Sequence, residues 1–270
     1  MQIKKCARCN REKELIKLLK SEGYWNKPSV WRYYGDRENN FAAIGNQQSE
    51  PCSALVEKIT NSVDAMLMRK VLSNGIDPEG PNSPSSIKKA QEKFFNIDLG
   101  NLANITSRER TTLAKNLALV ASGLKTAPTY SIIDKGEGQT PANMPTTILS
   151  LGRSNKLRIP FVQGKFNMGG TGALQFCGER NIQLVISKRN PEVAKYEEDP
   201  TKHKWGFTVV RREDPKKGMK NSTFTYLAPN DNIPTFEAKS IPLWPEEHPT
   251  EHSKPLKWGT FIKPELFIAP

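Results

Sequence analysis

The 270-residue sequence has few of the residues that build disulfide scaffolds and metal centres, with four cysteines and three histidines. Disulfide-stabilised domains carry far more cysteine for their length. Cys6 and Cys9 form a Cys-x-x-Cys pair, but Cys52 and Cys177 stand alone, and no histidine is spaced as a ligand near a second pair. Because structural zinc usually needs four ligands, we interpret the pair as part of a flexible, reduced N-terminus, with zinc binding as the alternative.

Long apolar runs are also missing. No segment is long enough to cross a bilayer, and the charged start, MQIKKCARCN, lacks the apolar core of a signal peptide. These absences predict a cytoplasmic protein that has no membrane partner.

The sequence also has fewer acidic than basic residues. It contains 28 Asp and Glu and 40 Lys and Arg, which gives a formal net charge of +12. The basic excess is concentrated in residues 151–220. Such a balance indicates a polyanionic partner, either nucleotide phosphates or nucleic acid. A basic, soluble surface is the alternative.

The first half of the sequence favours helices. Residues 11–20 and 52–72 have apolar positions at helical spacing, and Pro51 suits a helix start. Residues 106–124 are also predicted to form a helix, whereas residues 74–86 are rich in Gly, Pro, Ser and Asn and predict a loop.

An aromatic segment, residues 24–41, separates the first two helices. Its aromatic side chains interleave with Arg32 and Arg37, an arrangement that would suit base stacking. The interpretation that we favour is a strap over the core of the protein or over a partner subunit. The anchors of this strap would be Trp25, Trp31, Tyr33 and Tyr34.

The second half favours strands, because it contains short β-branched and aromatic runs without helices between them. These runs are residues 129–134, 181–188, 205–212, 222–228 and 258–263. We therefore expect an α+β fold, a two-layer sandwich in which helices cover one face of a mixed, mostly antiparallel sheet. Residues 1–45 would form an N-terminal helix and strap, and residues 46–270 the main domain, with an insertion at about 73–125.

The helix at 52–72 carries a polar stripe. At about 100° per residue, Glu57, Asn61 and Asp64 fall on one side. The opposite side, which we expect to pack on the core, carries Leu55, Ile59, Val63 and Met66. A glutamate can deprotonate water, and an amide oxygen one turn away can hold Mg²⁺, so this stripe fits a base beside a metal ligand. A solvated face is the alternative.

Three further motifs follow along the chain. In IIDKGEG, Asp134 ends a strand, and Gly136 and Gly138 let a ligand approach the backbone closely. In GKFNMGGTGALQF, a glycine-rich run leads into a helical segment, an arrangement that favours phosphate. The spacing matches neither a Walker loop nor a Rossmann fingerprint. In WGTFIK, Thr260 lies on a late strand.

Taken in this order, the motifs resemble the GHKL superfamily of ATP-binding domains, which includes DNA gyrase, the heat-shock-ninety chaperones, histidine kinases, and the MutL and MORC proteins. EKITNSVDA resembles its N-box, DKGEG and GKFNMGGTG its two glycine boxes, and the Gly-Thr pair before residue 261 its last motif. The resemblance covers residues 40–263 and implies a Bergerat-type fold that binds ATP with Mg²⁺.

The resemblance also implies a role for each matching residue. Glu57 would be the general base, Asn61 the Mg²⁺ ligand, and Asp134 the contact to adenine. The remaining nucleotide-binding residues would be Asp64, Gly136, Gly138, Ser154, Lys156, Gly169, Gly170, Thr171, Gly172 and Thr260. Of these, Asp64 would brace the motif, and Ser154 and Lys156 lie where relatives carry a mobile lid.

Several functions fit this resemblance. The first is an ATPase that dimerises when ATP closes the lid, with the strap reaching a second copy. The second is a switch that binds nucleotide without hydrolysis, because relatives usually draw a phosphate-binding lysine from a following domain and this sequence looks like the N-terminal part of something longer or a minimal module. The third is a basic nucleic-acid-binding module. Analogy with relatives adds DNA transactions and genome defence as settings.

Overall fold

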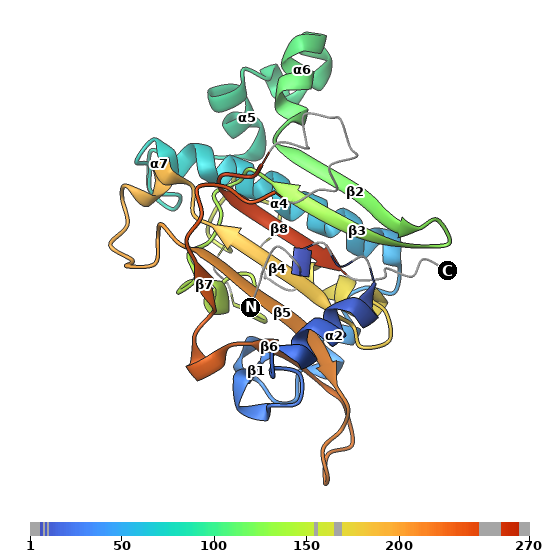
Figure 1. Ribbon diagram of the computed structural model, residues 1–270. Helices are drawn as coiled ribbons and strands as arrows, with labels where there is room; N and C mark the ends of the chain where they lie inside the picture. The colour runs from blue at the N-terminus through green and yellow to red at the C-terminus, as the bar shows by residue number, and fades with distance from the viewer. Residues whose placement is uncertain are drawn as a thin grey trace.

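The computed structural model describes residues 6–7, 9, 11–153, 156–164, 169–242 and 255–264. They build an α+β protein around one open, eight-stranded sheet of order β1-β6-β5-β4-β8-β3-β2, with β7 paired to β5 beside this path (Figure 1). The strands are β1 Trp31–Tyr33, β2 Leu117–Leu124, β3 Ala127–Asp134, β4 Gln183–Lys188, β5 Trp205–Glu213, β6 Thr223–Leu227, β7 Thr235–Phe236 and β8 Gly259–Pro264.

Helices dominate the first half of the chain, as predicted. The α-helices are α2 Glu12–Ser21, α3 Phe41–Gly45, α4 Pro51–Ser73, α5 Ile87–Phe95, α6 Ser107–Ala114 and α7 Pro191–Ala194. The 3-10 helices are η1 Pro28–Val30, η2 Tyr34–Asp36, η3 Asp98–Gly100, η4 Leu102–Asn104, η5 Met144–Thr146, η6 Gly169–Phe176 and η7 Pro229–Asp231. The predicted helices at 11–20 and 52–72 and the five predicted strands are confirmed.

The sheet has two apolar faces. Side chains alternate along a strand, so Leu184 and Ile186 of β4 point to one face, and Val185 between them points to the other. All pairings between the named strands are antiparallel. The predicted mostly antiparallel sheet is therefore confirmed, and no parallel pair occurs among the described strands.

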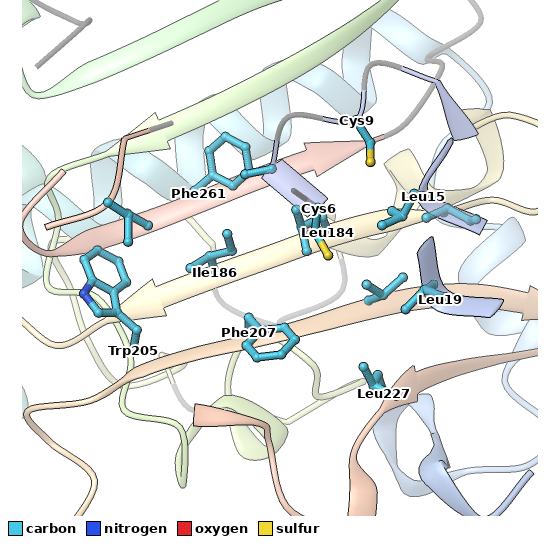
Figure 2. Close-up of a cluster of buried hydrophobic side chains, with 14 of the residues drawn as sticks. Cys6, Cys9, Leu15, Leu19, Leu184, Ile186, Trp205, Phe207, Leu227 and Phe261 are labelled. Carbon is cyan, nitrogen blue, oxygen red and sulfur yellow. The ribbon is translucent and has the colours of Figure 1, made fainter. Parts of the chain in front are cut away.

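Helix α2 covers the first of these faces. Leu15 and Leu19 are fully buried against strand residues that include Leu184 and Phe207 (Figure 2). Helix α4 lies behind the sheet, on the other face (Figure 1). The expectation that helices cover only one face, in two layers, is therefore wrong. Both faces are apolar, and burying them stabilises the fold at about 25 cal/mol per Å².

The aromatic segment supplies the edge strand β1 of the sheet and packs against β5. The Arg211 guanidinium lies 3.6 Å from the Trp31 ring centroid and 4.5 Å from that of Trp25, on the α2 side. Strand β1 then pairs with β6, and Tyr34 is buried on the α4 side. Within this chain, the segment is a strap over the protein's own core.

The predicted helix at residues 106–124 is wrong in its second half. A capping box between Thr106 and Glu109 begins helix α6, which ends at Ala114. Strand β2 follows, and Leu117 pairs with Asp134 at the start of a hairpin with β3. The last part of the predicted insertion is thus an edge strand of the central sheet.

Helix α4 packs through a different side from the predicted one. Its buried residues include Ala54, Lys58, Ser62 and Leu67, whereas Val63, expected in the core, is 36% exposed. The polar stripe therefore turns inward. The reason is that α4 forms one wall of a cavity, so the side that faces the sheet needs polar groups as well as apolar ones.

Candidate functional site

A cavity of about 360 Å³ lies between helix α4 and the face of the sheet that carries Val185. Asn61, Ser62 and Ala65 of α4 line one wall, and Asp134 and Thr260 of the sheet line the opposite wall. The volume falls within the range of small-molecule sites. Motifs that are far apart in the sequence thus meet at one cavity.

Asp134 is the buried acid of this cavity. It ends strand β3 and is 4% exposed. Its carboxylate accepts hydrogen bonds from the Ser62 hydroxyl (3.2 Å) and from the Gly136 N–H (2.9 Å). Burial raises the pKa of Asp134 to about 7, although both donors favour the ionised form. The group is therefore only partly ionised at neutral pH, and in its ionised form it can accept a hydrogen bond from a ligand.

The two glycines after Asp134 lie where a side chain would not fit. A Cβ on Gly136 would come within 2.6 Å of the Ala65 Cβ on α4. Gly138 has φ +64°, and a Cβ there would lie 1.9 Å from the carbonyl oxygen of Lys188. Glycine is required at both positions, so that this segment can pass between α4 and β4.

Thr260 lies beside Asp134, as predicted. The two residues are direct partners in the β3–β8 pairing, and both line the cavity. The Thr260 hydroxyl is 3.0 Å from that of Ser187, which in turn accepts the N–H of Gln139 (2.8 Å). This network fixes the direction of the Thr260 side chain.

Asn61 and Glu57 lie one helical turn apart on α4. The Asn61 amide donates a hydrogen bond to the Glu57 carboxylate over 3.5 Å. Asn61 lines the cavity; among the described residues that do so, Glu57 is absent. The predicted metal ligand, Asn61, thus lines the cavity. The predicted base, Glu57, lies one helical turn away and outside the described lining.

Asp64 braces a neighbouring segment and does not line the cavity. Its carboxylate is 1% exposed and accepts hydrogen bonds from the backbone N–H groups of Gln163 (3.0 and 3.1 Å) and Gly164 (2.8 Å). This position fixes the chain next to Asn61. Lys156 lines the cavity as well, whereas Ser154 lies outside the described residues.

The glycine-rich run continues as helix η6. Gly170 and Thr171 line the cavity, and Thr171 is buried. A Cβ on Gly172 would come within 2.9 Å of the Gln48 side chain, so this glycine allows η6 to pack against the chain before α4. Gly169 is the first residue of η6, and residues 165–168 are outside the described part.

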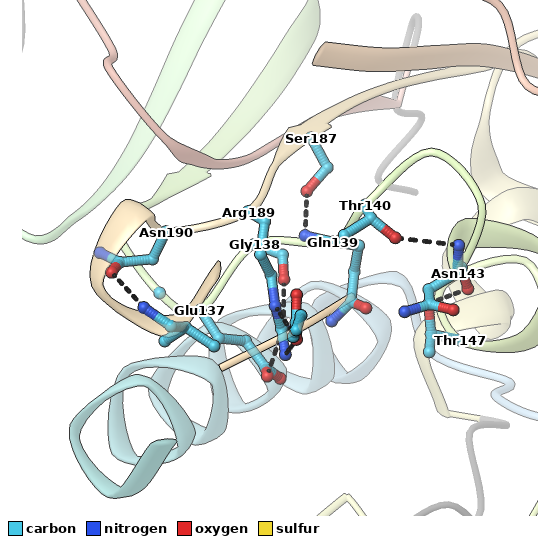
Figure 3. Close-up of polar contacts among 12 residues, drawn as sticks. Glu137, Gly138, Gln139, Thr140, Asn143, Thr147, Ser187, Arg189 and Asn190 are labelled. Carbon is cyan, nitrogen blue, oxygen red and sulfur yellow. Dashed lines mark hydrogen bonds and ion pairs between the residues drawn. The ribbon is translucent and has the colours of Figure 1, made fainter. Parts of the chain in front are cut away.

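A buried ion-pair network at the wall of the cavity was not predicted. Arg189 is 8% exposed, and it donates hydrogen bonds to Glu137 (2.8 Å) and to the Gly138 carbonyl (2.7 Å) (Figure 3). It also donates a hydrogen bond to Glu197 (2.8 Å). Arg189 and Glu137 also line the cavity. Through these bonds Arg189 fixes the position of Glu137 and Gly138, in the glycine segment that follows Asp134. No sequence signal distinguished Arg189 from the many surface arginines.

Lys58 was also missed. It lies next to Glu57 in the sequence but points inward, is 4% exposed and lines the cavity. Its ammonium donates a hydrogen bond to the Gly170 carbonyl over 2.7 Å. The one available signal was its position directly after Glu57 in the motif, and lysine is so often a surface residue that this signal is weak.

The first cysteines are packed, in contrast to the flexible terminus that was expected. Cys6 and Cys9 are buried on the α2 side of the sheet (Figure 2), and neither is in a disulfide. The buried Lys263 ammonium donates hydrogen bonds to the carbonyls of Ala7 (3.1 Å) and Cys9. Within the described ranges, no group of three or more His, Cys, Asp or Glu side chains is arranged to hold a metal ion.

The cavity therefore has chemically different ends. Ser62 marks the end with the buried carboxylate of Asp134, and Lys58 marks the end beside Gly170, about 6 Å away along the helix axis. A ligand with a hydrogen-bond donor at one end and negative charge at the other would match both.

Comparison with models of protein families finds no match, and comparison with curated proteins finds none either. The chain thus has no relative from these comparisons that would assign the cavity. In the part of the chain that the structure describes, no helix is both long and apolar enough to span a membrane.

Proposed function

We propose that this chain is a magnesium-dependent ATP-binding and ATP-hydrolysing domain with a Bergerat-type fold, similar to the GHKL superfamily. The observation that carries this proposal is the meeting of Asp134, Asn61 and Gly170 at one cavity between α4 and the sheet. These residues come from three motifs, and the first and the last of the residues are more than a hundred positions apart in the sequence. A polar helix face and two unrelated glycine turns would have no reason to converge.

The lining fits the parts of the nucleotide. Asp134 would accept the exocyclic amine of adenine, on a floor shaped by Gly136, Gly138 and Thr260. The Asn61 amide oxygen is a hard ligand that suits Mg²⁺. Backbone N–H groups of Gly169, Gly170, Thr171 and Gly172, with Lys156, would hold the phosphates. When bound, ATP supplies the phosphoanhydride bond, and Mg²⁺ supplies positive charge against the phosphate oxygens.

Hydrolysis is assigned to Glu57 as the general base, because its carboxylate is held one turn from Asn61. A switch that binds nucleotide without turnover is the second candidate. It is favoured by one observation, namely that Glu57 is not among the described residues that line the cavity. As a general base, Glu57 would act only after the site closes around its ligand.

The proposal extends to partners of the chain. An ATP-dependent homodimer in a cytoplasmic setting, acting on DNA or in genome defence, stays a proposal by resemblance. Trp25 and Trp31 already pack on Arg211, which argues against base stacking on these two side chains. The net charge of +12 remains the argument for nucleic acid.

Calorimetry with ATP and GTP, each with Mg²⁺ and with a chelator, tests the proposal. Guanine presents an oxygen where adenine presents its amine, so ATP should bind at least about tenfold more tightly than GTP, a difference of about 1.4 kcal/mol. Asp98→Asn, on an exposed 3-10 helix, is the control for Asp134→Asn, which should abolish the preference. Equal affinities for ATP and GTP would contradict the assignment of Asp134.

A further inference from the structure

Lys58 is a buried cation that faces the cavity. Its side chain extends from α4 towards η6, and within the described residues its ammonium donates one hydrogen bond, of 2.7 Å, to the carbonyl of Gly170. The residue is 4% exposed and contributes to the cavity lining. An ammonium group has three donors, so this single carbonyl leaves part of its hydrogen-bonding capacity directed at the cavity.

The charge of Lys58 is not balanced by a carboxylate. Among the described residues, no Asp or Glu forms an ion pair with it. Burial lowers its pKa to about 8, and Glu57 and Cys177 raise the pKa only in part. Buried charges are normally paired, because an unpaired one is costly to remove from water. The cavity therefore lacks one negative charge at this end.

The position of Lys58 indicates which part of a ligand would supply that charge. Asn61 is less than one turn further along α4, and a Cβ on Gly170 would lie 3.6 Å from the Asn61 amide nitrogen. Lys58, Asn61 and Gly170 are thus neighbours, and Asp134 is reached only at Ser62. If adenine occupies the Asp134 end, the far end of the nucleotide lies next to Lys58.

We propose that Lys58 binds the terminal phosphate of the nucleotide from within this chain, an inference that rests on the proposed ATP site. The ammonium would contact the terminal phosphate oxygens while it stays next to the Gly170 carbonyl. The same contact would link phosphate binding to the position of η6. A merely structural role, in which Lys58 ties α4 to η6, would not distinguish ATP from ADP.

The test measures ATP and ADP affinities, with Mg²⁺, for the parent protein and for Lys58→Met. A charge-assisted hydrogen bond corresponds to about 10–100-fold in affinity. We expect Lys58→Met to lower the affinity for ATP by that factor and the affinity for ADP by much less. Lys58→Arg should recover most of the lost affinity for ATP. Lys70→Met is the matched control, because Lys70 lies on the same helix and is directed at Phe95. Equal losses of affinity for ATP and ADP would contradict the role of Lys58 and leave the proposed ATP site unaffected.

A second ligand separates this inference from the proposed function. Inorganic tripolyphosphate carries the anionic part of ATP without the base. One outcome is that tripolyphosphate stabilises the parent, that ATP stabilises it no more than GTP does, and that Lys58→Met removes the stabilisation by tripolyphosphate. This outcome would support the anion site and contradict the adenine site. If neither ligand raises the melting temperature of the parent, both proposals fall. Circular dichroism of each variant confirms that it is folded.

Discussion

The hydroxyl of Ser62 donates a hydrogen bond to the carboxylate of Asp134 across 3.2 Å, and so joins helix α4 to the end of strand β3. Both partners are buried. The contact places a titratable group in a low-dielectric interior, where its hydrogen-bond donors, the Ser62 hydroxyl and the Gly136 N–H, are neutral. Burial outweighs these donors, and the pKa of Asp134 rises to about 7.

The first prediction is a pH dependence of stability. The folded protein holds the Asp134 proton up to about pH 7, whereas the unfolded chain loses it near pH 3.8. The contribution of Asp134 to the free energy of unfolding is therefore complete below pH 4 and is lost as the pH rises to 7, by at most about 4 kcal/mol. Urea unfolding of the parent and of Asp134→Asn at pH 4, 5.5 and 8 measures it. Parallel pH profiles for the two proteins would refute the shifted pKa.

The second prediction concerns Glu57. Glu57→Ala should bind Mg-ATP like the parent and lose turnover by about 100-fold or more, because a general base acts in the transition state. Glu50→Ala is the control, since Glu50 is exposed just before α4. Phosphate release and calorimetry together give the result. Unchanged turnover in Glu57→Ala would make Glu57 only part of a polar helix face, and a parent without turnover would favour the switch.

The third prediction concerns Asn61. If its amide oxygen holds Mg²⁺, Asn61→Ala should weaken ATP binding when Mg²⁺ is present and have little effect in a chelator. Calorimetry in both conditions measures the difference, with an expected loss of about tenfold for one hard ligand. A loss of the same size without Mg²⁺ would show that Asn61 contacts the nucleotide directly.

The fourth prediction is that Lys58 destabilises the empty protein. Its lowered pKa means that the folded state disfavours the ammonium, so the cost is largest below pH 8 and disappears as the pH approaches 10.5. Lys58→Met should raise the free energy of unfolding at pH 7 by roughly 2 kcal/mol, after loss of the hydrogen bond to Gly170. Urea unfolding at pH 7 and pH 10 measures the change, and an unstable Lys58→Met at pH 7 would contradict it.

The fifth prediction concerns the layer that α2 forms. Leu19 is fully buried, so Leu19→Ala should lower the free energy of unfolding by about 2–5 kcal/mol. Leu102→Ala is the control, because Leu102 is 55% exposed. The same layer means that deleting residues 1–45 removes part of the core and cannot isolate a role of the strap in dimerisation. Equal stabilities of the two variants would show that α2 contributes little.

The sequence predicted the parts of the fold that local patterns determine. The strands rich in β-branched residues and helix α4 are where they were expected, and the capping box at Thr106 marks a true helix start. Strand β2 was missed because its Leu, Ala and Val residues suit a helix as well as a strand. Pairing with β3 decides its structure, and this tertiary contact is invisible to a local pattern.

The candidate site was predicted in a similar way. Asn61, Asp134 and Thr260 are recognisable by motif, and the structure brings all three to one cavity. Lys58 and Arg189 were not recognisable, because a buried cation looks like a surface one until its surroundings are known. The inward turn of the polar stripe on α4 was missed for the same reason: a polar face normally contacts water, whereas here Asn61 lines the cavity and Asp64 accepts backbone N–H groups.

The position of strand β8 affects the order in which the sheet can form while the chain is being synthesised. It is the last named strand along the chain, yet it lies in the middle of the sheet, between β4 and β3. Before residues 259–264 leave the ribosome, β3 and β4 have unpaired edges that face each other, and such edges can pair with other chains. The two halves of the cavity, one bearing Asp134 and the other Gln183, join only then. The cavity is thus complete only once β8 has paired with both β3 and β4.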